Sequence, residues 1–134
     1  MLNELSKQIH ENAKSKGFFD NEKNIGEMLC LIHSEVSEAL EAVRTNKYYS
    51  NCVDKQKWFI KGMADKNYGA TFNDDLFFKE QFENRVKNSF EDELADVIIR
   101  VLDLCGYKGI DIEKHIALKM KYNSMREHKH GKQY

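Results

Sequence analysis

Residues 90 to 104 read FEDELADVIIRVLDL and combine acidic side chains with an apolar stripe on one predicted helix. Glu93, Asp96 and Arg100 lie along the flank of that stripe. Since side chains three residues apart on a helix are neighbours, the two carboxylates can point at one place. The stripe itself follows steps of three and four residues and comprises Leu94, Val97, Ile98, Val101 and Cys105. The stretch therefore predicts a core helix with a pair of acids at its edge.

An earlier predicted helix repeats this arrangement, because residues 31 to 44, LIHSEVSEALEAVR, carry a second acid pair beside another apolar stripe. The stripe has the spacing of a helix-bundle seam and comprises Ile25, Leu29, Ile32, Val36, Ala39 and Val43. If the two helices pack together, four carboxylates converge at the edge of a core. A hard divalent cation relieves the repulsion in such a cluster, because it prefers oxygen ligands. The predicted metal ligands are Glu35, Glu38, Glu93 and Asp96.

Composition favours a single all-α domain over residues 1–134, long enough for one core. The chain contains no proline, 41% of its residues are hydrophobic, and helix-forming residues outweigh strand-forming clusters. A net charge of −1 argues against binding of a nucleic-acid polymer, which requires many phosphates to be neutralised. The N-terminus is too polar for a signal peptide, and no apolar run approaches the ~20 residues of a membrane span. We therefore expect a cytoplasmic protein with no membrane partner.

The cysteines agree with a reducing compartment. Cys30, Cys52 and Cys105 are odd in number and form no CxxC pair. Two of them fall within apolar helical stretches, which predicts buried free thiols.

Capping and stop signals divide the chain into helices. The first helix is expected from about residue 3 to residue 16, where Gly17 ends it. Its expected buried residues are Leu5, Ile9 and Ala13, and Phe18 and Phe19 are expected in the core. A capping box formed by Asn24 and Glu27 predicts a second helix that runs to about residue 46. Ser89 is expected to cap the acidic helix, which Gly106 and Gly109 would end, and Asp111 to cap the last helix.

The interval between residues 48 and 88 reads as an irregular insertion. From residue 48 to residue 73 the helical periodicity fails, glycines interrupt the pattern, and six aromatic residues gather. Helical order is expected to return at Asp74 or Asp75. The aromatic side chains could stack on a nucleobase or cover a neighbouring subunit, and packing against the bundle is the simpler interpretation.

The last helix carries a second set of polar residues. Lys119, Asn123 and Arg126 share one helical face, and Lys132 follows in a basic tail over residues 128–134 that is expected to be flexible. Ile112, Ile116 and Met120 are expected to point inward and anchor this helix. Lysine and arginine beside a metal-carboxylate cluster suit a polyphosphate ligand, although such a run on its own is more often a solvated face.

The two acid pairs and the closing segment KMKYNSMREHKHGKQY together resemble the MazG-type all-alpha nucleoside triphosphate pyrophosphohydrolases. The resemblance covers the second helix and everything from about residue 87 onward. The interval between the two acid pairs is longer than in compact members of that family. The family resemblance implies a four-helix-bundle-like fold in which the insertion separates the second core helix from the third, and a dimer or tetramer.

The resemblance also implies an activity. Mg²⁺, or Mn²⁺ as a substitute, would be held by the four acids, and water would cleave a nucleoside triphosphate between its α and β phosphates. Glu35 is then the candidate proton acceptor, with Glu41 and Asp92 as outer acids. The phosphates would be bound by Lys119, Asn123, Arg126, Lys132 and, from a neighbouring helix, Lys87.

Two other classes of protein remain open. A di-iron carboxylate bundle uses inward glutamates, but it requires Glu-x-x-His pairs, which neither Glu35 nor Glu93 forms. A non-catalytic helical interaction module, in which the acids pair with Arg44, Arg100 and lysines, explains the helices equally well. It does not explain why the acids occur as two matched pairs.

Overall fold

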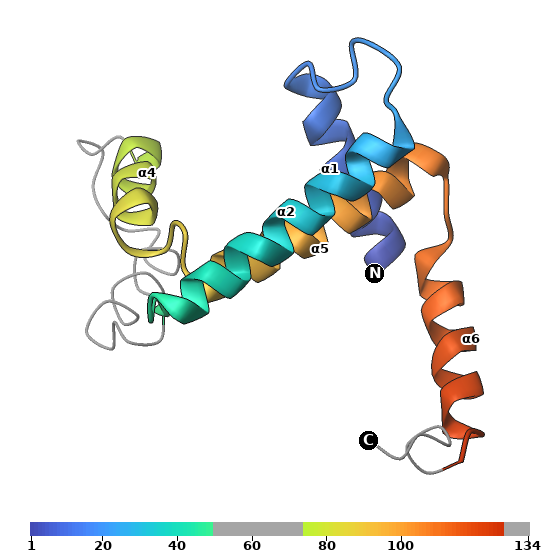
Figure 1. The fold of residues 1–134 in the computed structure, drawn as a ribbon. Helices are drawn as coiled ribbons and strands as arrows, with labels where there is room; N and C mark the ends of the chain where they lie inside the picture. Colours follow the sequence, from blue (N-terminus) through green and yellow to red (C-terminus); the bar gives the residue numbers. More distant parts are fainter. Residues whose placement is uncertain (50–73, 128–134) are drawn as a thin grey trace. The chain divides into compact units, whose positions relative to one another are not determined.

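A computed structural model describes residues 1–49 and 74–127 of the chain. Over these ranges the protein is helical and has no strand, which confirms the all-α prediction (Figure 1). Its helices are α1 (Leu2–Ser15), α2 (Ile25–Arg44), α4 (Asp74–Arg85), α5 (Phe90–Lys108) and α6 (Ile112–Ser124). No helix within these ranges is long and apolar enough to cross a membrane. The aromatic stretch over residues 50–73 and the tail over residues 128–134 lie outside the description.

The chain divides into two compact units. One consists of residues 1–28 and 99–134, and the other of residues 29–98. Both α2 and α5 begin in one unit and end in the other.

Three helices end in the same hydrogen-bonded motif, which places one residue in the left-handed region. Gly17 after α1, Asn46 after α2 and Gly109 after α5 have φ values of +80°, +55° and +63°. At the end of α2, for example, the Lys47 N–H donates to the Ala42 carbonyl at 2.8 Å. The sequence therefore fixes the ends of these helices locally, and the predicted boundaries are within two residues of those observed.

The predicted N-caps are confirmed. The Asn24 side chain accepts a hydrogen bond from the Glu27 N–H at 3.3 Å, and the Asp111 side chain caps α6. At α5 the Ser89 hydroxyl accepts from the Asp92 N–H at 3.3 Å, while the Asp92 carboxylate accepts from the N–H of residue 88. The Asp92 carboxylate therefore takes part in the N-terminal cap of α5.

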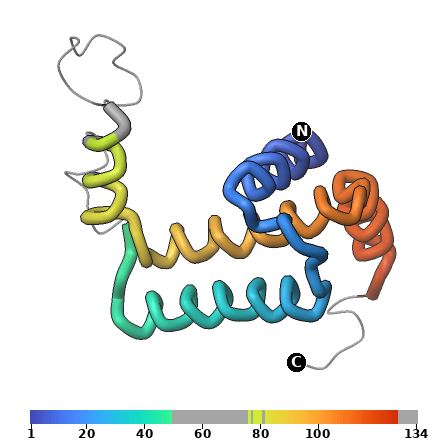
Figure 2. The backbone as a smooth tube through the Cα atoms, turned by 90° about the horizontal axis from the view of Figure 1, so that it is seen from above, coloured from blue at the N-terminus to red at the C-terminus, as the bar shows by residue number. Residues whose placement is uncertain are grey.

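In the unit of residues 29–98, α2 and α5 lie side by side and antiparallel (Figure 2). Where α5 begins, the Phe90 N–H donates to the Lys47 carbonyl at 2.9 Å, and the Tyr48 and Phe90 rings lie 5.7 Å apart. The Tyr49 N–H donates to a carboxylate oxygen of Glu91 at 2.8 Å. These contacts tie the two ends of the insertion together.

The predicted bundle seam of α2 is buried only in part. Val36 is 50% exposed, and Leu29 and Val43 are exposed as well. Ala39 of the seam is buried, and Ile25 and Ile32 are half-buried. The other buried residues of this helix are Glu35 and Ala42. The prediction was wrong for the three exposed residues, because small alanines line the buried face and Glu35 is buried with them.

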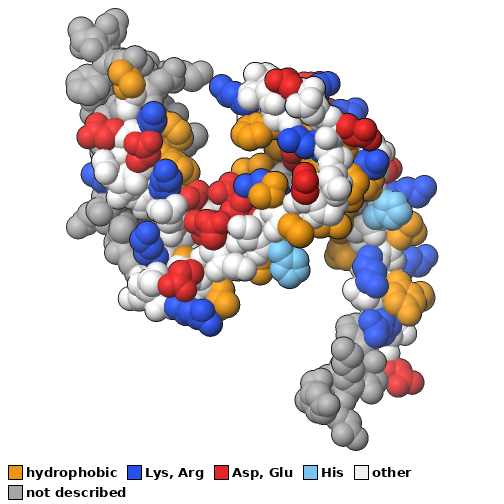
Figure 3. Space-filling model, turned by 45° about the horizontal axis from the view of Figure 1, so that its top comes forward, with side chains coloured by type: hydrophobic (Ala, Val, Ile, Leu, Met, Phe, Trp, Pro, Cys, Tyr) orange, Lys and Arg blue, Asp and Glu red, His pale blue; other side chains and the backbone are white. Residues whose placement is uncertain are grey.

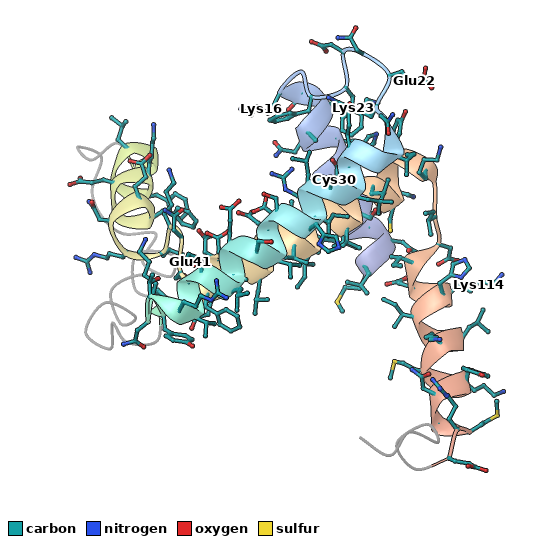
Figure 4. All side chains as sticks on the ribbon, in the orientation of Figure 1. Lys16, Glu22, Lys23, Cys30, Glu41 and Lys114 are labelled. Carbon is teal, nitrogen blue, oxygen red and sulfur yellow. The ribbon has the colours of Figure 1, made fainter. Side chains whose placement is uncertain are left out.

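In α5, too, part of the predicted apolar stripe is not buried. Leu94 and Ile98 of the predicted stripe are exposed, and Val97 and Val101 are half-buried. Cys105 is buried, and burial raises the pKa of its thiol. Cys30 is exposed near the start of α2, contrary to prediction, and Cys52 lies outside the described residues (Figure 4).

In the other unit, α1 packs against residues 99–108 of α5. The Ser6 hydroxyl donates to the Leu102 carbonyl at 2.6 Å, and His10 Nδ1 lies 2.8 Å from Asp103 Oδ1. A Cβ at position 106 would lie 2.7 Å from the Cβ of His10. Gly106 therefore permits this close approach from inside α5, instead of ending the helix as predicted.

Several apolar residues expected in the core of this unit are exposed or only half-buried. On α1 the buried residue is Ser6, whereas Leu5 is exposed and Ile9 and Ala13 are half-buried. Of the two residues that follow Gly17, Phe18 is exposed, and Phe19 packs its ring 4.5 Å from that of His10.

No side chain of α6 is buried, so the prediction that its apolar residues anchor it was wrong. Met120 is 67% exposed, Ile116 is also exposed, and Ile112 is half-buried. Contacts to α1 hold the first turn instead, where the Asn3 side chain donates to Asp111 at 2.7 Å and the Leu2 N–H donates to Glu113.

Candidate metal centre

Three carboxylates meet within the unit of residues 29–98. Glu35 and Glu38 of α2 and Glu93 of α5 each offer an oxygen, and these oxygens all lie within 4.8 Å of one another. Glu35 is 6% exposed and Glu93 is 4% exposed, whereas Glu38 is exposed. The cluster thus has two acids on the buried side and one on the solvent side.

Helix geometry explains this arrangement. Glu35 and Glu38 are three residues apart, so they are neighbours on the surface of α2. The small residues Ala39 and Ala42 continue the buried face of α2. The packing brings Glu93, one turn into α5, opposite the acid pair of α2.

The electrostatics of the cluster are repulsive. Burial raises the pKa of Glu93, and the nearby negative charges of Glu38, Asp92, Asp96 and Glu35 raise it further. The proton on Glu93 is therefore held more tightly than on an ordinary glutamate. A cation that replaced this proton would remove the same repulsion.

Asp96 does not belong to the group of three converging acids. It is half-buried one turn after Glu93, and its charge contributes to the raised pKa of that residue. The structure therefore brings together three of the four predicted ligands and leaves Asp96 beside them.

The two proposed outer acids have other partners. Glu41 is exposed in the last turns of α2, where its carboxylate lies 3.8 Å from the guanidinium of Arg44 (Figure 4). Asp92 contributes its charge to the cluster while it caps α5. Glu38 accepts a hydrogen bond from the Ser34 hydroxyl at 3.2 Å, which restrains the exposed member of the cluster.

Of the predicted phosphate-binding residues, Lys119 and Asn123 lie on α6, in the unit that does not contain the acids. Arg126 follows the C-cap of this helix, Met125, so the prediction that it shares a helical face with the other two was wrong. All three side chains are exposed, and lysine side chains alternate with apolar ones along α6 (Figure 3). Lys87, after α4, is also exposed, and Lys132 lies outside the described residues.

The contact of Tyr122 with two of these cations was not predicted from the sequence. Its ring centroid lies 5.3 Å from Lys119 Nζ and 5.9 Å from Arg126 Cζ. Its contact with Lys119 could have been read from the spacing, because residues three apart on a helix are neighbours. Its contact with Arg126 could not, because Arg126 lies beyond the end of α6.

The donor set fits a hard cation. All three candidate ligands are carboxylates, and oxygen-only sites suit Mg²⁺, Mn²⁺ or Ca²⁺ in preference to the softer metals that cysteine and histidine select. The three acids do not distinguish among these ions.

No protein-family model matches the chain, and neither a curated protein nor a solved structure matches it significantly.

Proposed function

We propose that this protein is a Mg²⁺-dependent nucleoside triphosphate pyrophosphohydrolase. The convergence of Glu35, Glu38 and Glu93 from two helices is the observation that carries the proposal. Two buried carboxylates held close to a third destabilise the folded protein unless a proton or a cation offsets their repulsion. Substrates with many phosphate oxygens are the usual partners of such cation sites.

In the proposed reaction, a water oxygen bonds to the α phosphorus, and the bond from that phosphorus to the α–β bridging oxygen breaks. The products are a nucleoside monophosphate and pyrophosphate. When bound, Mg²⁺ or Mn²⁺ supplies charge neutralisation to the phosphate oxygens. Glu35 is the proposed acceptor of the proton that the attacking water loses, because it is the buried acid of α2.

Lys119, Asn123 and Arg126 are the proposed binding groups for the phosphate chain, with Lys87 and Lys132 as further cations. Arginine can donate two parallel hydrogen bonds to a phosphate, while lysine acts as a point charge. The side chains of Lys119, Asn123 and Arg126 are exposed, which leaves them accessible to an anionic ligand.

We also propose that the protein forms a homo-oligomer. The outward face of α2 exposes four large aliphatic residues within one unit: Leu29, Val36, Leu40 and Val43. Large apolar side chains exposed together on one helix favour association with another chain. Light scattering at micromolar concentration is expected to give the mass of two or more chains, and a monomeric mass would contradict this proposal.

The activity is tested by measuring pyrophosphate release from a panel of canonical and modified NTPs and dNTPs with Mg²⁺. We expect release from at least one substrate and none after the metal is chelated. Absence of release from every substrate would favour the other class, a non-catalytic helical interaction module.

A further inference from the structure

Tyr122 occupies a specific position between two cations on α6. Lys119 Nζ and Arg126 Cζ lie 5.3 Å and 5.9 Å from its ring centroid. Lys119 lies within α6, whereas Arg126 follows the C-cap of that helix, Met125. Because both cationic groups approach the same ring, their tips converge on Tyr122.

Within residues 1–49 and 74–127, no carboxylate forms an ion pair with Lys119 or Arg126. Glu113, the acid in the first turn of α6, is hydrogen-bonded by the Leu2 N–H. The long side chains of Lys119 and Arg126 are thus restrained by an aromatic ring, which attracts a cation without neutralising its charge.

We infer that Lys119, Tyr122 and Arg126 form a polyphosphate clamp in which Tyr122 is a positioning residue. The lysine ammonium carries three N–H donors and the guanidinium carries five, so both retain donors for an anion while they contact the ring. A ligand with several linked phosphates can contact both cations at once, whereas orthophosphate can contact only one of them. The clamp selects a linear polyphosphate and requires no metal.

This inference rests on the proposed function in one respect, since it assigns these residues to the triphosphate of the substrate. Binding of inorganic tripolyphosphate can nevertheless be measured without turnover. The clamp and the proposed function can therefore be contradicted independently of each other.

The experiment is calorimetric titration of the full chain with tripolyphosphate, pyrophosphate and orthophosphate in the presence of EDTA. We expect the affinity to fall in that order. Tyr122→Leu should raise the Kd for tripolyphosphate about fivefold, the scale of two weak ring contacts, whereas Tyr122→Phe should stay within about twofold. Lys119→Ala and Arg126→Ala should each raise it about tenfold.

Lys114→Ala is the matched control, because Lys114 is exposed in the first turn of the same helix (Figure 4). It should leave the Kd within about twofold. Circular dichroism of each variant checks that the helix content is unchanged, and recovery of affinity in Tyr122→Phe separates a role of the ring from a role of the hydroxyl.

Equal affinity of the wild type and Tyr122→Leu would overturn the inference, as would equal affinity for orthophosphate and tripolyphosphate. If no NTP releases pyrophosphate but tripolyphosphate binding still depends on Tyr122, the clamp stands and the proposed function fails. If turnover is present and the Tyr122 and Arg126 variants bind tripolyphosphate normally, the clamp alone is wrong.

Discussion

The carboxylate cluster of α2 and α5 and the cationic residues of α6 are built in opposite ways. Glu35 and Glu93 are buried, and burial together with neighbouring acids raises the pKa of Glu93. Lys119 lies on α6, a helix that buries no side chain, and the exposed Arg126 follows its C-cap. Like charges in a buried position destabilise the fold until a ligand arrives, whereas exposed cations impose little cost. Stability and ligand binding should therefore be coupled in the first region and independent in the second.

The largest expected effect tests the acidic side of this comparison. Glu38→Gln removes the exposed member of the cluster and should reduce metal-dependent kcat/KM at least about a hundredfold, because a ligand of the cation is lost. The fold should be retained, since Glu38 is exposed. Glu41→Gln is the control, because Glu41 is an exposed acid of the same helix that lies beside Arg44. Similar rates for Glu38→Gln and the wild type would remove the proposed centre.

Arg126→Ala tests the cationic side. Loss of a hydrogen bond to a charged group should lower kcat/KM by about 1.5–3 kcal/mol in activation free energy. The melting temperature should not change, because the residue is exposed beyond the end of α6. Lys121→Ala, at an exposed lysine near the end of α6, is the control. A fall in melting temperature without a change in kinetics would give Arg126 a structural role instead.

The two regions should also differ in their tolerance of altered side chains. Ala39→Leu inserts a larger side chain at a position that is 4% exposed, and it should destabilise the protein by about 1–3 kcal/mol in urea unfolding. Met120→Ala removes a side chain that is 67% exposed and should change stability by less than about 0.5 kcal/mol. Equal effects of the two substitutions would contradict the burial described for α2 and α6.

The smallest effect concerns pH. Because the folded-state pKa of Glu93 is raised above its ordinary value of 4.5, the folded protein binds more protons than the unfolded chain between those two values. Stability of the metal-free protein should therefore decrease as pH rises through this window. Glu93→Gln should flatten that dependence in melting curves recorded with EDTA and be modestly stabilising at neutral pH. An unchanged pH profile would show that the cluster is not repulsive.

Local signals in the sequence predicted much of the fold. The caps Asn24, Ser89 and Asp111 and the stops Gly17 and Gly109 act through hydrogen bonds within a few residues, so they can be read without tertiary structure. The i, i+3 spacing likewise placed Glu35 beside Glu38.

Which face of each helix is buried could not be read in the same way. Val36 and Met120 continue regular apolar patterns, yet they are exposed. Ser6 is polar but buried, and its hydroxyl donates a hydrogen bond to the Leu102 carbonyl. Burial depends on how closely two helices approach, and small residues such as Ala39 and Gly106 set that distance. Hydrophobicity alone does not report this distance, which is also why Asp96 was expected within the cluster and lies beside it.

The central claim is that Glu35, Glu38 and Glu93 hold a divalent cation, and thermal melting with and without Mg²⁺ or Mn²⁺ tests it most directly. A ligand that binds only the folded state should raise the melting temperature of the wild type by about 5 °C at ten times its Kd. The same concentration should leave Glu38→Gln nearly unchanged. No rise in the wild type, or an equal rise in Glu38→Gln, would contradict the claim.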